Sequence, residues 1–280
     1  MRTEDEIKGL LLRFAESDPR IRAVLLNGSR VNRKITPDTL QDYDIVFVVT
    51  EIASFTADHE WIDVFGETII VQMPDAMCFG ERGPGFSYLM LFADYNRIDL
   101  TLLPETSIDS GFQFESLTQV WLDKDRRFLL LPPPSDADFL VKRPGEKLFL
   151  DTCNEFRWLS TYVAKALLRK DVIDAKKIME TAVRPMFMKM IEWQVAAENN
   201  FEIAGGKLLR LNISDQLYES ILLTYAGPGI DENWRSILQM GQLFEKTASN
   251  LAATLGYTIN TCEQQQVLKY LCDRYHSRNK

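Results

Sequence analysis

The stretch that decides the fold is LLNGSRVNRKITPDTLQDYDIVFVVT, residues 25–50. It ends in an apolar run rich in β-branched residues, which predicts a buried strand over residues 44–50. Asp42 and Asp44 stand at the mouth of this run, where burying a carboxylate is costly. Residues two apart in a strand share a face and lie about 6.6 Å apart, so both carboxylates point to one spot. Because Mg²⁺ prefers carboxylate and phosphate oxygens, the pair predicts a site for a hard divalent cation.

The neighbourhood of this pair is more informative than the pair itself. Asp-x-Asp recurs at residues 123–125 and 136–138, where charged or proline-rich surroundings indicate solvated turns. Only the first copy follows an apolar run that ends in Gly28 and Ser29. A residue without a Cβ followed by a hydroxyl lets backbone N–H groups and the serine approach phosphate oxygens closely.

A third carboxylate, Asp99, lies in the strand predicted over residues 97–103. If that strand neighbours the first, three carboxylates surround one or two metal ions, the usual device for in-line displacement at phosphorus. The four cysteines form no CxxC pair, and only two isolated histidines are present. The sequence therefore offers no zinc site and no Ser/His/Asp triad, and its chemistry must use carboxylates, cations and hydroxyls.

The composition is that of a globular protein with one large domain or two ordinary ones, since 46% of its 280 residues are hydrophobic and 26% charged. The apolar runs are too short to span a bilayer. Charges interleave the apolar positions of the N-terminal segment, unlike a signal peptide. We therefore expect a cytoplasmic protein with no membrane partner, either a monomer or a homodimer.

Charge is divided unevenly along the chain. Residues 1–135 contain 13 Lys and Arg against 22 Asp and Glu, a net charge of −9, whereas residues 136–280 have a net charge of +1. A protein that grips DNA or RNA along its backbone needs a basic face, so the acidic front half disfavours a nucleic-acid partner. It favours a cationic partner, with acidity for solubility alone as the alternative.

The periodicity of the apolar residues changes at the three prolines of residues 132–134, which forbid continued helix or central strand. Before them the pattern predicts one helix, residues 4–16, and five strands, residues 21–26, 44–50, 67–72, 86–92 and 97–103. After them it predicts helices at residues 148–170, 172–199, 214–223, 231–255 and 262–275. We expect an α/β (α+β) domain with a mixed sheet, residues 1–135, followed by an all-α helical bundle, residues 136–280.

The Gly-Ser, Asp-x-Asp and later carboxylate together resemble the nucleotidyltransferase superfamily typified by DNA polymerase β. The wider match is closer. The chain resembles the aminoglycoside 6-adenylyltransferases, also called streptomycin adenylyltransferases, over essentially its whole length, in the motifs NGSRVNR, LQDYDIVFVVT, WIDVFGE, RIDLTLLP, STYVAKALLRK and VRPMFMKMIEW. Arg157 departs from this pattern, because an aromatic side chain is expected there.

The resemblance implies transfer of AMP from ATP to the 6-hydroxyl of streptomycin, with release of pyrophosphate and with Mg²⁺ as the cofactor, and hence antibiotic resistance. It implies that Asp42 and Asp44 hold Mg²⁺ against the triphosphate. It implies that Asp99 is the general base or a ligand of a second metal ion. The residues expected to cradle the phosphates are Gly28, Ser29 and Arg30; for Arg30 a merely solvated side chain is the alternative.

The predicted helix over residues 148–170 would supply further groups to the ligands. One stripe of this helix can mix aromatic and ionic groups, because these residues recur at helical spacing: Glu155, Trp158 or Leu159, Tyr162, and Lys165 or Arg169. Lys165 is the candidate cation for the triphosphate, and Glu155 could receive a guanidinium of the drug bidentately or pair with a nearby cation. Trp158 and Tyr162 are candidate substrate contacts, with ordinary core packing as the alternative.

Three other functions remain open from the residues alone. The acceptor could be a different aminoglycoside or a protein hydroxyl, because nothing in the three aspartates distinguishes these from streptomycin. The chain could also be a catalytically silent nucleotide-binding module. Such a module is expected to have lost one of the carboxylates, and all three are present.

Overall fold

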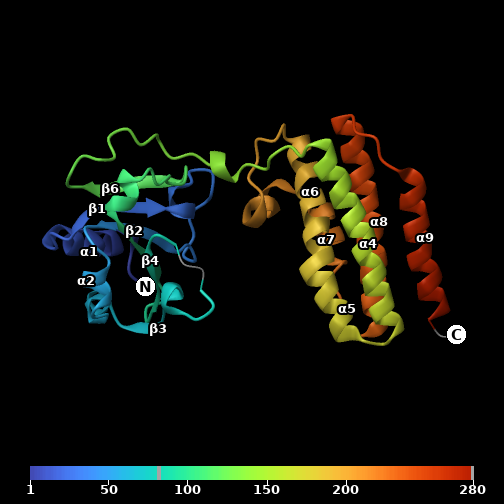
Figure 1. Ribbon diagram of the computed structural model, residues 1–280, viewed down its shortest axis with the longest axis horizontal. Helices are drawn as coiled ribbons and strands as arrows, with labels where there is room; N and C mark the ends of the chain where they lie inside the picture. The colour runs from blue at the N-terminus through green and yellow to red at the C-terminus, as the bar shows by residue number, and fades with distance from the viewer. Residues whose placement is uncertain (81–82, 279–280) are drawn as a thin grey trace. The chain divides into compact units, whose positions relative to one another are not determined.

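The computed structural model describes residues 1–80 and 83–278. The chain forms two compact units, Met1–Asp138 and Phe139–Lys280. The first contains a sheet with short helices and the second is helical (Figure 1). None of the helices in the described ranges combines the length and the apolar character needed to cross a membrane.

The first unit is built on one six-stranded sheet with the order β3-β4-β5-β2-β1-β6. Its central pair, β2 and β5, is parallel, and the remaining pairs are antiparallel, which confirms the expected mixed sheet. The strands are β1 Ile21–Asn27, β2 Tyr43–Val49, β3 Thr68–Gln72, β4 Phe86–Phe92, β5 Arg97–Pro104 and β6 Thr118–Asp123.

The edge strand β6 was not predicted from the sequence, and its pairing with β1 explains why. Val24 faces Leu122 but the next residue, Leu25, faces Val120, so β6 has an extra residue, Trp121, at this point. Such a bulge breaks the two-residue alternation of side chains. Trp121 and Leu122 consequently pack with one core while Val120 packs with the other.

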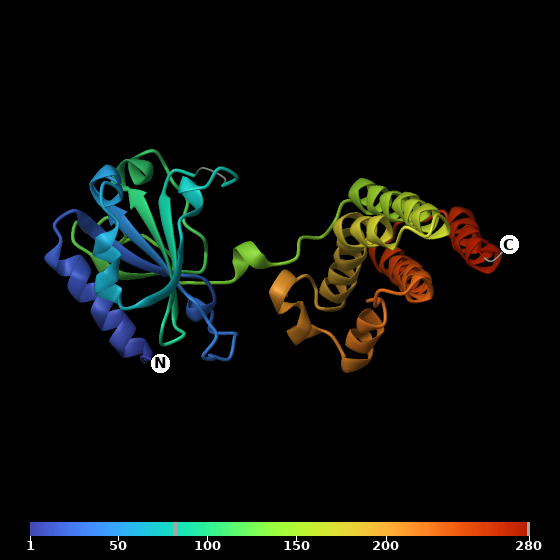
Figure 2. The ribbon, with the colours of Figure 1, turned by 90° about the horizontal axis from the view of Figure 1, so that it is seen from below.

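Helix α1, Glu4–Ser17, lies against one face of the sheet (Figure 2). Its buried side chains, Ile7, Leu11 and Ala15, recur every four residues and join a core with the apolar side chains of the central strands. The other face packs against a smaller cluster that includes Phe114 and Phe128. The short helices of this unit are α2 Ala53–Thr56, α3 Glu105–Asp109 and the 3₁₀ helices η1 Gly28–Val31, η2 Glu60–Phe65, η3 Pro74–Ala76 and η4 Ala137–Phe139.

The second unit is a bundle in which the long helices run side by side (Figure 1). Its helices are α4 Glu146–Leu168, α5 Val172–Ile178, α6 Arg184–Glu198, α7 Asp215–Leu222, α8 Ile230–Leu255 and α9 Thr261–Ser277, with the 3₁₀ helix η6 Gly206–Asn212. The predicted single helix over residues 172–199 is continuous but contains a π-helical turn, η5 Met179–Val183, between α5 and α6. Pro185 explains the turn, because its ring has no N–H and crowds the preceding turn of an ordinary helix.

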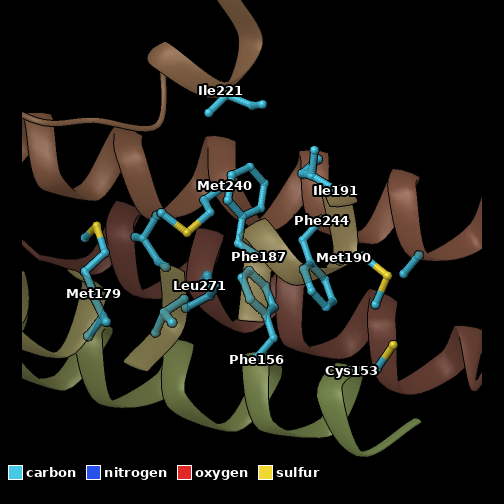
Figure 3. Packing of buried hydrophobic residues seen from close by; sticks show 14 of the residues in the cluster. Cys153, Phe156, Met179, Phe187, Met190, Ile191, Ile221, Met240, Phe244 and Leu271 are labelled. Carbon is cyan, nitrogen blue, oxygen red and sulfur yellow. The ribbon is translucent and has the colours of Figure 1, made fainter. Parts of the chain in front are cut away.

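Aromatic rings and methionines fill the core of the bundle (Figure 3). The rings of Phe156 and Phe244 stack with centroids 3.7 Å apart. Next to them Arg157, 4% exposed, donates to both carboxylate oxygens of Glu245 at 2.8 Å and to Glu263 at 3.1 Å. The arginine found in place of the expected aromatic residue therefore ties α4 to α8 and α9 inside the helical unit.

Candidate active site

The three predicted aspartates come together because of the register between two strands. Asp44 of β2 is the direct partner of Asp99 in the parallel strand β5, so their side chains stand next to each other on one face. Asp42 precedes β2, and its carboxylate lies 3.7 Å from a guanidinium nitrogen of Arg97, which also binds Asp99. The buried ring of Tyr43 points to the opposite face. The carboxylates therefore converge, as the spacing predicted.

Gly28 leaves the space that the Asp44 carboxylate occupies. Asn27, the last residue of β1, pairs with Asp44, and the chain then turns sharply into η1 with Gly28 at a φ of 78°. A Cβ on Gly28 would lie 2.2 Å from Asp44 Oδ2, which is impossible without moving the carboxylate. The N–H of Gly28 already donates to the Leu117 carbonyl at 3.0 Å. Gly28 thus supplies space for the carboxylate and its own N–H is already bonded, while the expected approach of this turn to phosphate stays a prediction.

The side chain of Arg30 contacts the segment that precedes β2. Its side chain is only 10% exposed, stacks 3.6 Å from the centre of the Tyr43 ring, and pairs with Glu4. The guanidinium donates to the carbonyl oxygens of Gln41 and Asp42 at 2.7 and 3.1 Å. These contacts hold the segment that leads into β2, so the solvated side chain considered from the sequence is wrong. Direct contact of Ser29 and Arg30 with phosphate stays a prediction.

Asp44 is the carboxylate of this group whose charged form is disfavoured by its surroundings. It is half-buried, and within residues 1–80 and 83–278 no group donates a hydrogen bond to it. Burial, followed by repulsion from Asp99 and Asp42, raises the pKa of Asp44 to about 6. A carboxylate without donors, surrounded by like charges, is stabilised by a cation.

Arg97 is the cation that the structure places among these carboxylates. Its Nε and Nη2 donate to the two oxygens of Asp99, each at 2.8 Å, and its Nη1 lies 3.7 Å from Asp42. The hydrogen bonds to Asp99 raise the pKa of Arg97. With the side chains so tied, the described part of the chain contains no ready-made group of three Asp, Glu, His or Cys ligands for a metal ion. The donor set itself consists of carboxylate oxygens and fits a hard cation such as Mg²⁺.

Arg97 shares the face of Asp99, as expected for residues two apart in a strand, but its ion pair with Asp99 was not predicted. Glu115 was missed from the sequence altogether, since it lies in the loop before the unpredicted strand β6. Its charge adds to those that raise the pKa of Asp44.

The other two Asp-x-Asp copies are not the solvated turns expected from the sequence, because Asp123 ends β6 and Asp138 lies in η4, but each contains an aspartate paired with a cation. Asp125 is bound by both Nε and Nη2 of Arg22. Asp136 accepts from Lys34 Nζ at 2.7 and 2.9 Å. The contrast with Asp44, which lacks any donor in the described ranges, marks the first copy as the one that is not explained by structure alone.

The predicted stripe on α4 lies at the surface of the helical unit. Trp158 is 59% and Tyr162 38% exposed, so core packing is the wrong explanation for both. The indole N–H of Trp158 donates to the Tyr162 hydroxyl at 3.0 Å, and Lys165 Nζ lies 5.0 Å from the centre of the Tyr162 ring. Glu155 is exposed, and no ion pair of Glu155 occurs among the residues that the structure describes.

Residues 1–274 match the sequence family described as streptomycin adenylyltransferase. The chain belongs to this family. Among curated relatives, the aminoglycoside 6-adenylyltransferase of Campylobacter jejuni is 41% identical over 261 residues, which cover 92% of this chain and 91% of the relative. That of Bacillus subtilis is 37% identical over 263 residues, covering 92% and 93%. A solved aminoglycoside 6-adenyltransferase from Bacillus subtilis aligns with 99% of this chain and 100% of its own, at 32% identity and a TM-score of 0.49.

Proposed function

We propose that this member of the streptomycin adenylyltransferase family transfers AMP from ATP to the 6-hydroxyl of streptomycin, releases pyrophosphate, and so confers resistance. The observation that supports it best is the convergence of Asp42, Asp44 and Asp99, with Asp44 half-buried, without a donor among the described residues and repelled by its neighbours. The relatives named aminoglycoside 6-adenylyltransferase support the acceptor class. Bound Mg²⁺ would supply the positive charge that the triphosphate and these carboxylates need.

Each residue of the site has its own role in the proposed reaction. Asp42 and Asp44 would hold the cation against the triphosphate, and Gly28 leaves the space that the Asp44 carboxylate occupies. The acceptor oxygen forms a bond to the α-phosphorus, and the bond from that phosphorus to the bridging oxygen of pyrophosphate breaks. If Asp99 is the general base, the acceptor proton goes to one of its oxygens; if Asp99 would instead ligate a second cation, the proton leaves to solvent. Ser29 contacts phosphate.

The helical unit would contribute the remaining contacts. Streptomycin carries two guanidinium groups, fixed cations that favour planar carboxylates, and Glu155 offers an exposed one. Trp158 and Tyr162 offer exposed rings on which such a cation or a ring of the drug can stack. Lys165 is the candidate for the triphosphate. In this proposal residues 1–135 form the nucleotidyltransferase domain and residues 136–280 the substrate- and nucleotide-binding domain of a cytoplasmic enzyme.

The test is pyrophosphate release from ATP and Mg²⁺ across a panel of aminoglycosides. Release that depends on streptomycin supports the proposal. Release only with another aminoglycoside would correct the acceptor, and release only with a protein substrate would replace it. No release with any acceptor, while ATP still binds in a calorimetric titration, would make the chain a silent nucleotide-binding module.

A further inference from the structure

Arg97 has contacts that the proposed chemistry does not use. It is the first residue of β5, two residues before Asp99, and its side chain is 44% exposed. Among the described residues it forms ion pairs only with Asp99 and Asp42. Arg30, on the same unit, is different: it is nearly buried, stacked on Tyr43 and bonded to backbone carbonyls. Within residues 1–80 and 83–278 no comparable contacts hold Arg97, so among these residues the two aspartates alone keep its guanidinium where it is.

Both aspartates also have roles in the proposed chemistry: Asp42 is a ligand of the cation, and Asp99 is the general base or a ligand of a second cation. Arg97 binds both oxygens of Asp99 and lies 3.7 Å from Asp42, so a positive charge already lies against these two carboxylates. A divalent cation placed against Asp42 and Asp44 would stand within a few ångströms of that charge and be repelled. One of the two cations must therefore leave Asp99 and Asp42 for the other to bind well.

We propose that Arg97 is an internal counter-ion that competes with the divalent cation for Asp99 and Asp42, and that it transfers to the phosphates when metal and nucleoside triphosphate bind together. This inference rests on the proposed function, because it assumes that metal and triphosphate bind at these aspartates. The exchange keeps charges paired: the carboxylates pass from a guanidinium to the metal, and the guanidinium passes to phosphate oxygens, which it can bind bidentately. It also frees both oxygens of Asp99 to accept a proton.

The guanidinium of Arg97 can move from the aspartates to a phosphate by rotation of its own side chain. Arginine reaches several ångströms from its α-carbon, and the side chain of Arg97 is exposed at the start of its strand. Arg97 and Asp99 lie in the same strand, β5. A change of the Arg97 rotamer therefore moves the charge without moving the sheet. The role is that of a positioning residue for Asp99 and Asp42 before the nucleotide binds, and of a phosphate contact afterwards.

The first measurement is Mn²⁺ binding to the full chain without nucleotide, followed by electron paramagnetic resonance at pH 8, above the pKa of Asp44. Arg97→Gln should bind Mn²⁺ more tightly than the wild type, on the order of tenfold, since a unit charge about 5 Å from a divalent ion repels it by that much even in a water-like dielectric. Arg97→Lys, which keeps the charge, should recover most of the wild-type affinity.

A matched control removes a similar ion pair elsewhere in the sheet. Arg22 binds Asp125 through Nε and Nη2, as Arg97 binds Asp99. Arg22→Gln removes one positive charge and one two-pronged Arg–Asp pair without touching the site. It should leave Mn²⁺ affinity unchanged, which separates local competition from a general change in the charge of the protein.

The second measurement repeats the titration with Mn²⁺ and the non-hydrolysable analogue α,β-methylene-ATP. Here the order should reverse: Arg97→Gln should bind the complex about three- to tenfold more weakly than the wild type, because a charge-assisted contact to phosphate is lost. If Arg97 had a purely structural role, Arg97→Gln would change the affinity in the same direction with and without the analogue.

The outcomes separate this inference from the proposed function. If the wild type binds Mn²⁺, Asp44→Asn does not, and Arg97→Gln matches the wild type in both titrations, the metal site stands and the role of Arg97 is wrong. If Arg97→Gln weakens binding in both titrations, Arg97 supports the site structurally and the exchange is refuted. If the wild type binds no Mn²⁺ with or without the analogue, the metal site of the proposed function fails and this inference fails with it.

Discussion

Replacing Asp44 by asparagine removes the carboxylate that burial and its acidic neighbours disfavour most. In the folded chain the pKa of Asp44 is raised from the ordinary 3.8 to about 6. A raised carboxylate pKa means that the folded state holds this proton more tightly than the unfolded state. The associated stability is complete below about pH 4 and is lost as the pH rises through about 6.

The size of the effect follows from the shift. Two pKa units correspond to about 2.7 kcal/mol, and partial exposure of the side chain reduces this to about 1–2 kcal/mol. In the absence of metal, Asp44→Asn should therefore be more stable than the wild type at pH 8 by that amount. Its melting temperature should be higher by roughly 3–10 °C. At pH 4, where the wild-type carboxyl is protonated, the two should melt together.

Differential scanning calorimetry in chelator at pH 4 and pH 8 measures this difference. Asp125→Asn is the control, because that carboxylate is paired with Arg22 and its pKa is lowered; its replacement should not stabilise the protein at pH 8. If Asp44→Asn melts below the wild type at pH 8 in chelator, or is stabilised equally at both pH values, the reasoning about the strained carboxylate is refuted. The stabilised variant should be inactive.

Four further substitutions test the other parts of the site and the bundle. Gly28→Ala should lower kcat by roughly 10²-fold, the usual effect of a displacement of about 1 Å, since its Cβ would force the Asp44 carboxylate to move; normal kcat in steady-state kinetics would show that the close approach does not matter. Arg30→Lys keeps the charge but loses the paired carbonyl contacts, so kcat should fall about tenfold with little change in KM for ATP, whereas a rise in KM alone would mean that Arg30 contacts phosphate. Asp99→Asn should lower kcat by roughly 10²–10⁴-fold while streptomycin still binds in calorimetry; lost binding with a normal rate at saturation would make Asp99 a binding residue. Glu245→Ala leaves a buried guanidinium short of its main partner and should lower the free energy of unfolding by about 3–5 kcal/mol in urea denaturation, and a loss below about 1 kcal/mol would show that the pair is not needed.

The parts of the fold that were predictable are those with regular periodicity. Strands β1, β2, β4 and β5 and the long helices of the bundle carry apolar residues at regular spacing, and each was predicted to within a few residues. The convergence of Asp44 with Asp99 needed only the assumption that two predicted strands are neighbours, which the parallel register confirms.

The remainder depended on information that local periodicity does not contain. The bulge at Trp121 breaks the alternation by which β6 could have been predicted. Gly28 lies against Asp44 only because of the register between β1 and β2. The carbonyl partners of Arg30 have no sequence signature, because any residue can supply a carbonyl. The exposure of Trp158 was not predictable either, since an aromatic stripe at helical spacing has the same pattern whether it faces a core or solvent.

The most direct test of the central claim is transfer of radioactive label from [α-³²P]ATP to streptomycin, measured for the wild type and for Asp42→Asn and Asp44→Asn. The account predicts labelled streptomycin from the wild type with Mg²⁺, none in excess chelator, and a loss of at least roughly 10³-fold in each variant, because each removes a carboxylate that holds the cation against the triphosphate. Transfer by the wild type in chelator, or a near-normal rate in either folded variant, would contradict it.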